Sequence, residues 1–164
     1  ELPRVRKVLG VLRGLAPTSL IDLGSGRGTF LWPLLDAFPD LTVTAVDTNP
    51  VRVADINAVR EGGVSTLRAL RADASALELE DDCAEVVTAL EVLEHLPSPA
   101  RAAAEAVRVA SRYVVASVPS KEDDNPEHLH LFDRRAFESL LLDAGARGVK
   151  VEYVPNHIIA VAKV

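Results

Sequence analysis

Four acidic residues stand at or just after the ends of short apolar runs, where a parallel sheet presents side chains to a ligand. They are Asp22, Asp47, Asp73 and Glu91. In open α/β sheets, ligands bind beyond the carboxyl ends of the strands, so these carboxylates are expected along one edge. A carboxylate there can accept hydrogen bonds from both hydroxyls of a ribose. Because like charges repel, four acids at one edge favour a ligand with a cationic end.

Three glycines follow the first of these runs. The segment Ser19–Gly28 reads Ser-Leu-Ile-Asp-Leu-Gly-Ser-Gly-Arg-Gly, and Gly24, Gly26 and Gly28 remove the Cβ atoms that would keep a ligand from the backbone. A helical pattern comes next, so the segment predicts a strand, a glycine turn and a helix. A dinucleotide-binding turn has its third glycine at the sixth position, which here is Thr29, so a nicotinamide-dependent oxidoreductase is disfavoured.

The elements that must position these residues alternate between strands and helices, which predicts a mostly parallel sheet covered on both faces. The expected strands are 20–23, 41–46, 66–72, 85–90, 113–118, 149–154 and 157–162. The expected helices are 3–16, 30–38, 50–59, 99–110 and 134–144. Asn49, Ser98 and Asp133 are expected to cap the last three of these helices. Pro155 and Asn156 form a short turn, so the last two strands are expected to make an antiparallel hairpin.

The composition is that of an ordinary globular protein, with 48% hydrophobic and 26% charged residues in 164. No apolar run approaches the roughly 20 residues of a membrane-spanning helix, so no membrane partner is expected. The single cysteine, Cys83, excludes an internal disulfide and is expected to pack against the core, and a cytoplasmic location is expected. The net charge of −6 and the absence of a long Lys/Arg run disfavour a nucleic-acid partner.

The glycine turn and the strand-end acids together resemble class I S-adenosylmethionine (SAM) methyltransferases. The Asp22–Gly28 pattern is similar to the first motif of that family, whose glycine turn lies under the methionine part of SAM. Ala45-Val46-Asp47 looks like the motif that holds the SAM ribose, and Arg71–Ala74 looks like the motif that contacts adenine. The resemblance implies SAM as cofactor. The cofactor-binding residues expected are Asp22, Gly24, Ser25, Gly26, Gly28, Asp47, Thr48, Asp73, Ala74 and Glu91.

The resemblance covers nearly the whole chain, and it extends to the terminal hairpin. It implies a single Rossmann-like α/β domain over residues 1–164, with a seven-stranded, mostly parallel sheet, an antiparallel last strand and helices on both faces. The helix within residues 1–16 is expected to pack on the sheet or to cap it. One departure is the absence of the Gly-Gly pair that is frequent before the fifth strand. Ala110-Ser111-Arg112 stands there instead and is expected in a surface turn.

The segment after the fourth strand bears on the reaction type. It contains no Asn/Asp-Pro-Pro-aromatic tetrad, which amide- and adenine-amino methyltransferases of this fold use to grip a planar nitrogen. Its Glu91-x-x-Glu94-His95 run resembles two groups of O-methyltransferases, acting on ubiquinone precursors and on the 3′-terminal ribose 2′-hydroxyl of small RNAs. In both groups this run supplies ligands to a divalent cation. Two carboxylates and an imidazole can hold Mg²⁺, Mn²⁺ or Zn²⁺, and such an ion lowers the pKa of a bound hydroxyl.

A second pair of histidines, His128 and His130, follows the fifth strand. In an extended loop their rings point to opposite sides, so one of them, His130, is expected to face the edge. The expected metal ligands are therefore Glu91, Glu94, His95 and His130. His95 and His130 are also the candidate general bases, although aligning the nucleophile with the sulfonium methyl can supply much of the rate without a base.

The expected function is methyl transfer from SAM to a small-molecule acceptor, at an oxygen nucleophile. Two alternatives stay open. One is a metal-dependent RNA 3′-terminal ribose 2′-O-methyltransferase, which the Glu-x-x-Glu-His run favours. The other is a non-catalytic SAM-binding module, because only the first helix and residues 120–129 are available to cover a substrate.

Overall fold

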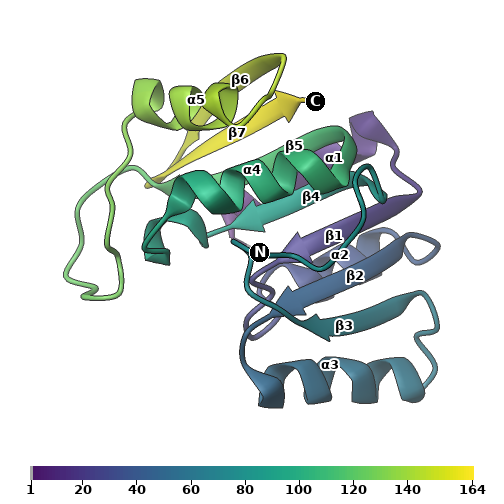
Figure 1. Cartoon of the computed structure of the whole chain (residues 1–164). Helices are drawn as coiled ribbons and strands as arrows, with labels where there is room; N and C mark the ends of the chain where they lie inside the picture. The colour runs from purple at the N-terminus through teal and green to yellow at the C-terminus, as the bar shows by residue number, and fades with distance from the viewer. Residues whose placement is uncertain (1) are drawn as a thin grey trace.

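A computed structural model describes residues 2–164 and contains one sheet with helices on both faces (Figure 1). The strands are β1 (Ser19–Leu23), β2 (Thr42–Asp47), β3 (Leu67–Arg71), β4 (Ala84–Leu90), β5 (Ala110–Pro119), β6 (Gly148–Val154) and β7 (His157–Lys163). The helices are α1 (Pro3–Leu15), α2 (Leu31–Ala37), α3 (Pro50–Glu61), α4 (Pro99–Val109) and α5 (Arg134–Asp143), with a 3₁₀ turn η1 (Leu93–His95).

The strand order in the 7-stranded sheet is β3-β2-β1-β4-β5-β7-β6. β1 pairs in parallel with β2 and β4, and the parallel part continues to β3 on one side and β5 on the other. β7 runs antiparallel to both of its neighbours, β5 and β6. The sequence prediction of a mostly parallel sheet with an antiparallel last strand is therefore confirmed. The order also places the carboxyl ends of β1, β2, β3 and β4 next to one another.

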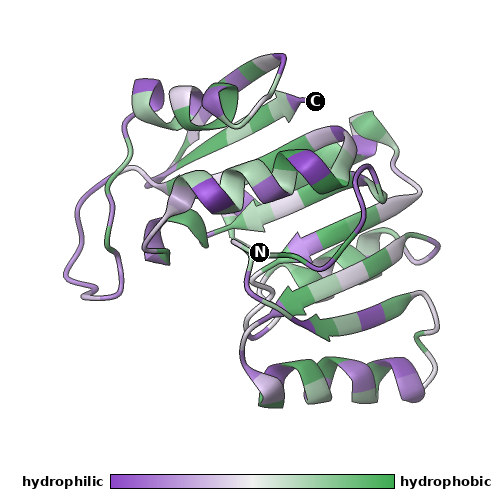
Figure 2. Ribbon diagram, viewed as in Figure 1, coloured by the Kyte–Doolittle hydropathy of each residue, from purple (hydrophilic) through white to green (hydrophobic). Residues whose placement is uncertain are grey.

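Two apolar clusters fill the space between the sheet and its helices. One contains residues of α1, α2 and α3, and the other contains residues of α4 and α5, which shows that the helices cover both faces. α4 crosses in front of β4 and β5 in Figure 1, and the strands are coloured mainly as hydrophobic in Figure 2. In β1, the side chain of Leu20 enters one cluster and that of Ile21 enters the other, as expected for a strand buried on both faces.

Local sequence signals set most helix ends. α1, α3 and α4 each have proline in the first turn, where the missing backbone N–H has no partner to lose. The side chain of Asn49 accepts hydrogen bonds from two backbone N–H groups at the start of α3, and that of Asp133 accepts one at the start of α5. Both predicted caps are therefore confirmed. No helix within residues 2–164 is long and apolar enough to cross a lipid bilayer.

Three local predictions are wrong. Ser98 occupies the cap position of α4, but its side chain makes no capping hydrogen bond. Ala110, Ser111 and Arg112 do not form a surface turn: α4 ends at the preceding residue, and all three belong to β5, where Ala110 is buried and pairs with Ala84. Cys83 is exposed, because it lies in the connection before β4 and not in the strand itself.

The long connection between β5 and α5 folds back onto η1. The carbonyl of Glu94 accepts hydrogen bonds from the backbone N–H groups of Leu129 (2.7 Å) and His130 (3.3 Å). The ring nitrogen Nε2 of His130 donates to the carbonyl of Leu96 at 2.8 Å. These contacts bring residues 127–130 to the carboxyl edge of the sheet, beside the residues that follow β4.

Candidate active site at the carboxyl edge of the sheet

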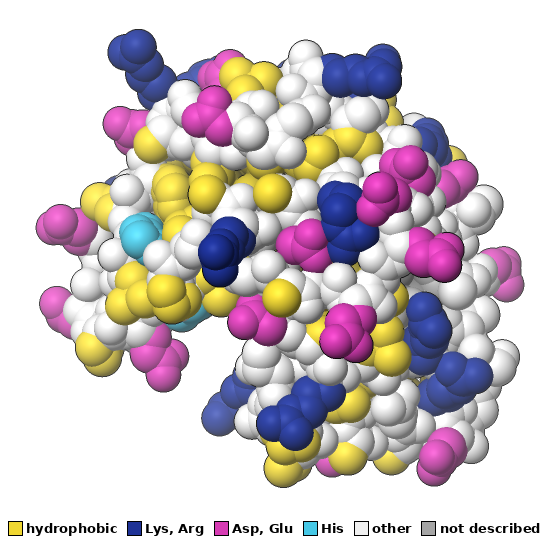
Figure 3. Space-filling model, in the orientation of Figure 1, with side chains coloured by type: hydrophobic (Ala, Val, Ile, Leu, Met, Phe, Trp, Pro, Cys, Tyr) yellow, Lys and Arg dark blue, Asp and Glu magenta, His cyan; other side chains and the backbone are white. Residues whose placement is uncertain are grey.

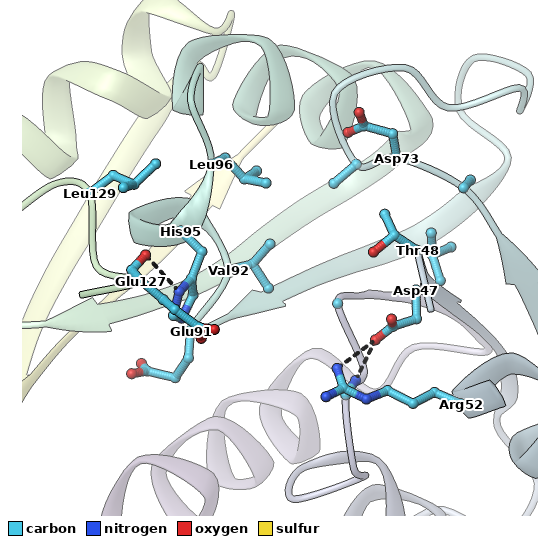
Figure 4. A pocket seen from close by; sticks show the side chains of 15 residues that line it. Asp47, Thr48, Arg52, Asp73, Glu91, Val92, His95, Leu96, Glu127 and Leu129 are labelled. Carbon is cyan, nitrogen blue, oxygen red and sulfur yellow. Dashed lines mark hydrogen bonds and ion pairs between the residues drawn. The ribbon is translucent and has the colours of Figure 1, made fainter. Parts of the chain in front are cut away.

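A cavity of about 590 Å³ opens at the carboxyl edge, between the segments that follow β1, β2, β3 and β4 (Figure 4). This volume is within the range of small-molecule and cofactor sites. The predicted cofactor residues that line it are Gly24, Gly26, Asp47, Thr48, Asp73, Ala74 and Glu91. The sequence did not single out Arg52, Val92, Leu96, Glu127 and Leu129, which also line it.

The glycine turn forms one wall of the cavity, and its glycines have different surroundings. Gly26 has a φ of +56°, and a Cβ built on it would meet no protein atom closer than 3.8 Å, so that Cβ would stand in open space at the cavity wall. Gly24 has a φ of +68°, and its Cβ would lie 2.5 Å from Cγ2 of Val92. Gly28 does not line the cavity, because its Cβ direction faces the ring of Trp32. Gly26 is therefore the position that keeps room for a ligand against the backbone.

Asp47, at the end of β2, is fixed by backbone groups. Its Oδ2 accepts a hydrogen bond from the N–H of Gly26 at 2.8 Å, and its Oδ1 accepts one from the N–H of Asn49 at 2.9 Å. Nη1 of Arg52, in the first turn of α3, lies 3.8 Å from Oδ2 (Figure 4). Each carboxylate oxygen has two acceptor positions, so one on each oxygen stays available for a ligand hydroxyl. The side chain is thus held in one orientation with acceptor positions free on both oxygens.

Asp22 lies deeper in the sheet than the sequence suggested, and it does not line the main cavity. Its side chain is buried and accepts hydrogen bonds from the hydroxyls of Ser25 and Thr88, both at 2.7 Å. Burial raises the pKa of Asp22 to about 6, against the two hydrogen bonds, which lower it. Asp22 and Ser25 instead line a smaller adjoining cavity of about 160 Å³. We conclude that Asp22 braces the glycine turn, because it holds Ser25 of that turn from inside the sheet.

A group of possible metal ligands lies beside the cavity, with a membership that differs from the predicted one. One ligand atom from each of Glu94, His95 and His128 lies within 4.8 Å of the others. The structure therefore brings His128, not His130, to Glu94 and His95. Residues 125–128 form a turn in which the N–H of His128 donates to the carbonyl of Asn125, so the extended conformation assumed for this loop is wrong. His130 is instead turned toward the carbonyl of Leu96.

Glu94 is the most unusual side chain in this group. It is completely buried, and neither of its carboxylate oxygens has a hydrogen-bond partner among residues 2–164. Burial and, next, the charge of Glu91 raise the pKa of Glu94 to about 8. Nε2 of His95 lies 3.6 Å from Oε1 of Glu94, and Nδ1 of His95 faces the carbonyl of Glu127 at 3.0 Å. A buried carboxylate without donors requires a proton or a nearby cation.

Glu91, the remaining predicted ligand, is directed elsewhere. Its Oε1 accepts a hydrogen bond from the hydroxyl of Ser117 at 2.9 Å, and its Oε2 lies 3.1 Å from Nε2 of His157. Ser117 and His157 carried no signal in the sequence, because they lie in β5 and at the start of β7, far along the chain from Glu91.

The space-filling view shows histidine and hydrophobic side chains gathered on the side of the molecule formed by the connection after β5 (Figure 3).

The comparison with known proteins agrees with this geometry. Residues 21–113, more than half of the chain, match the family model described as a methyltransferase domain. A ubiquinone biosynthesis O-methyltransferase of Cupriavidus pinatubonensis is 28% identical over 110 residues, which are 65% of this chain and 44% of that protein. The chain spans less than half the length of the curated relatives it matches.

Two solved structures show the same fold. A SAM-dependent methyltransferase of Aquifex aeolicus superposes with a TM-score of 0.78 at 22% identity, over 99% of this chain and 90% of that one. The 1,6-didemethyltoxoflavin-N1-methyltransferase of Burkholderia thailandensis, solved with its substrate and S-adenosylhomocysteine, superposes with a TM-score of 0.79 at 18% identity, over 97% and 77%. Since the family model matches more than half of its residues, the chain belongs to the methyltransferase domain family, and it has the fold of SAM-dependent methyltransferases.

Proposed function

We propose that this chain transfers a methyl group from SAM to an oxygen of a small-molecule acceptor. One observation carries the cofactor part of this proposal. The Asp47 carboxylate, held by two backbone N–H groups, stands beside the Cβ-free wall at Gly26 in a cavity large enough for a nucleoside. The O-methyltransferases among the relatives support the choice of oxygen.

The residues at the carboxyl edge fit the parts of SAM in order. Asp47 would accept the ribose hydroxyls, and Thr48 and Ala74 line the part of the cavity between β2 and β3, where the adenine is expected. Asp73 orders the turn beside it, since its Oδ1 accepts a hydrogen bond from the N–H of Ser75 at 2.8 Å. Glu91 adds negative charge near the junction with the smaller cavity. SAM supplies a methyl group that its positive sulfur has already activated.

His95 is the better candidate for the base. A carbonyl oxygen can only accept, so Nδ1 of His95 carries the proton that it donates to Glu127, and Nε2 keeps its lone pair. Nε2 can therefore take a proton from an acceptor hydroxyl, and the imidazolium that forms would lie beside the buried carboxyl of Glu94. His130, whose Nε2 donates to Leu96, does not line the main cavity and would only hold the loop.

The unpartnered oxygens of Glu94 favour a second component of the same site. As an alternative to His95 acting as the base, we propose that a divalent cation can bind between Glu94, His95 and His128, which offer one carboxylate and two imidazoles; Nε2 of His95 would then be a ligand of the ion. Such an ion would lower the pKa of an acceptor hydroxyl bound to it. Titration of the protein with Mn²⁺, followed by electron paramagnetic resonance, tests this part. Binding that Glu94→Gln leaves unchanged would contradict it.

Calorimetry with S-adenosylhomocysteine tests the cofactor site. Asp47→Asn is expected to weaken binding by at least tenfold, because an amide offers one acceptor oxygen in place of two and brings a donor to the N–H groups that hold it. Asp55→Asn is the matched control, because Asp55 is an exposed acid of α3 outside the cavity. No heat with the unaltered protein would refute the proposal.

Labelled SAM then tests the acceptor, with phenols and catechols as the first candidates. Label transferred to a phenolic or enolic oxygen supports the proposed reaction. Binding without transfer to any fraction of a cell extract would instead indicate a SAM-binding module. A third outcome would identify the ribose 2′-hydroxyl of RNA as the acceptor. In that case label is transferred to RNA 3′ ends, a chelator abolishes the transfer, and the affinity for RNA falls as the salt concentration rises.

A further inference from the structure

Glu91 occupies a strained position at the junction of two cavities. It lines both the main cavity and the smaller one, and its φ of +58° is in the left-handed region. For a residue with a Cβ this conformation is strained, because the Cβ comes too close to the following carbonyl oxygen. The N–H of Glu91 donates to the carbonyl of Ser117 at 3.0 Å, which holds the backbone in place. Strained residues persist where the surrounding structure fixes them, and they concentrate at functional sites.

Two side chains from distant parts of the sheet fix the carboxylate itself. Ser117, completely buried in β5, donates to Oε1, and His157, the first residue of β7, contacts Oε2. The other ring nitrogen of His157, Nδ1, faces the carbonyl of Pro155 at 3.1 Å. An ionised carboxylate only accepts hydrogen bonds, so Nε2 of His157 is the donor toward Glu91. The bond to Glu91 is then charge-assisted and therefore strong and directional.

The smaller cavity continues past the glycine turn and carries both signs of charge. Arg4 of α1 lines it together with Glu91, Asp22 and the backbone of Gly24. A guanidinium and a carboxylate facing one space complement the carboxylate and the ammonium of an α-amino acid. The amino-acid part of SAM is such a group, and it extends from the nucleoside that the main cavity is proposed to hold.

We infer that His157 and Ser117 are positioning residues, which fix Glu91 so that its free lone pairs receive the α-ammonium group of the cofactor. This inference rests on the proposed function. It assigns a role in cofactor binding to the terminal hairpin, which otherwise only completes the sheet. It also explains why a glutamate is tolerated at a left-handed position: the carboxylate is used there.

Truncated nucleosides separate this role from a merely structural one. S-Adenosylhomocysteine carries the whole amino-acid part, S-adenosyl-3-thiopropylamine keeps only the ammonium, and 5′-methylthioadenosine has neither charge. His157→Ala is expected to lower the affinity for S-adenosylhomocysteine and for the thiopropylamine by about tenfold, the size of one hydrogen bond to a charged group. The affinity for methylthioadenosine should not change. His157→Gln, which keeps an N–H donor, is expected to restore most of the loss. Ser117→Ala is expected to act like His157→Ala.

Lys150→Gln is the matched control, since it removes an exposed cation from the same hairpin and should change none of the three affinities. Thermal unfolding shows whether each variant is folded; should His157→Ala not fold, His157→Gln and Ser117→Ala carry the test. Equal losses for all three nucleosides, or no loss for any of them, would overturn the inference. Equal affinity of the unaltered protein for the three nucleosides would also overturn the inference. Failure of the unaltered protein to bind any of them would refute the proposed function itself.

Discussion

Asp22→Asn tests whether the acid below the glycine turn braces it at a cost in stability. The Asp22 side chain is 2% exposed, and burial raises its pKa from 3.8 to about 6. Asparagine has the same shape and can keep both contacts. Its amide can donate to Oγ of Ser25, which can in turn donate to the carbonyl of residue 22, 3.2 Å away. The substitution therefore removes the charge with little change in packing.

The pKa shift sets the magnitude. Raising the pKa from 3.8 to about 6 corresponds to about 3 kcal/mol, at 1.36 kcal/mol per unit. Because the folded protein holds this proton more tightly than the unfolded chain, the carboxyl contributes most below pH 3.8, and that contribution is lost as the pH rises through about 6. About 2 kcal/mol of the change should fall between roughly pH 4.5 and 7.5.

Urea unfolding of both proteins across this pH range measures the effect. The quantity of interest is the unfolding free energy of the unaltered protein minus that of Asp22→Asn, because the other titrating groups cancel in the difference. This difference should fall as the pH rises and should level off above about pH 7. A difference that does not change with pH would show that Asp22 keeps its ordinary pKa. A difference that rises with pH would show that the hydroxyls of Ser25 and Thr88 outweigh burial.

Three further predictions concern the site. Glu91→Gly should have a higher unfolding free energy in urea than Glu91→Ala, by up to about 1 kcal/mol, because glycine relieves the left-handed backbone, while both variants lose affinity for S-adenosylhomocysteine. Gly24→Ala should destabilise the fold by about 2 kcal/mol or more, through the overlap with Val92, whereas Gly26→Ala should remain folded by circular dichroism and bind the cofactor at least tenfold more weakly in calorimetry. With a chelator present, the stability of the unaltered protein relative to Glu94→Gln should fall as the pH rises from about 4.5 to about 8, because burial raises the Glu94 pKa; a pH-independent difference in urea unfolding would contradict this.

The strand register explains which strand-end acids were predicted well. Asp47 is the last residue of β2, so its side chain stands at the edge next to the glycine turn, as the sequence suggested. Asp22 pairs with Ala45 and with Thr88 inside the sheet, two residues short of the level of Asp47. A motif pattern gives the spacing along one strand, but the depth of a side chain depends on the register between strands. That register is a tertiary property that the sequence does not state.

The histidines show a second limit of the sequence. Alternation along the chain was used to choose His130 over His128, which holds only for extended backbone. The connection after β5 contains a turn and is held by the carbonyls of Glu94 and Leu96, so contacts with another segment decide which ring faces the site. His157 is a stronger case, because its partner Glu91 is 66 positions away and no local pattern joins them.

The two halves of the site therefore depend on different parts of the fold. The proposed cofactor half is fixed by backbone groups at strand ends, as the bond from the Gly26 N–H to Asp47 shows, and this explains why motifs could predict where Asp47 and Gly26 lie. The proposed acceptor half depends on residues 127–130, whose position rests on a few hydrogen bonds to η1. That connection can change in length and composition without moving Asp47. We therefore expect that substitutions in residues 127–130 change which acceptor receives labelled methyl and leave the affinity for S-adenosylhomocysteine unchanged.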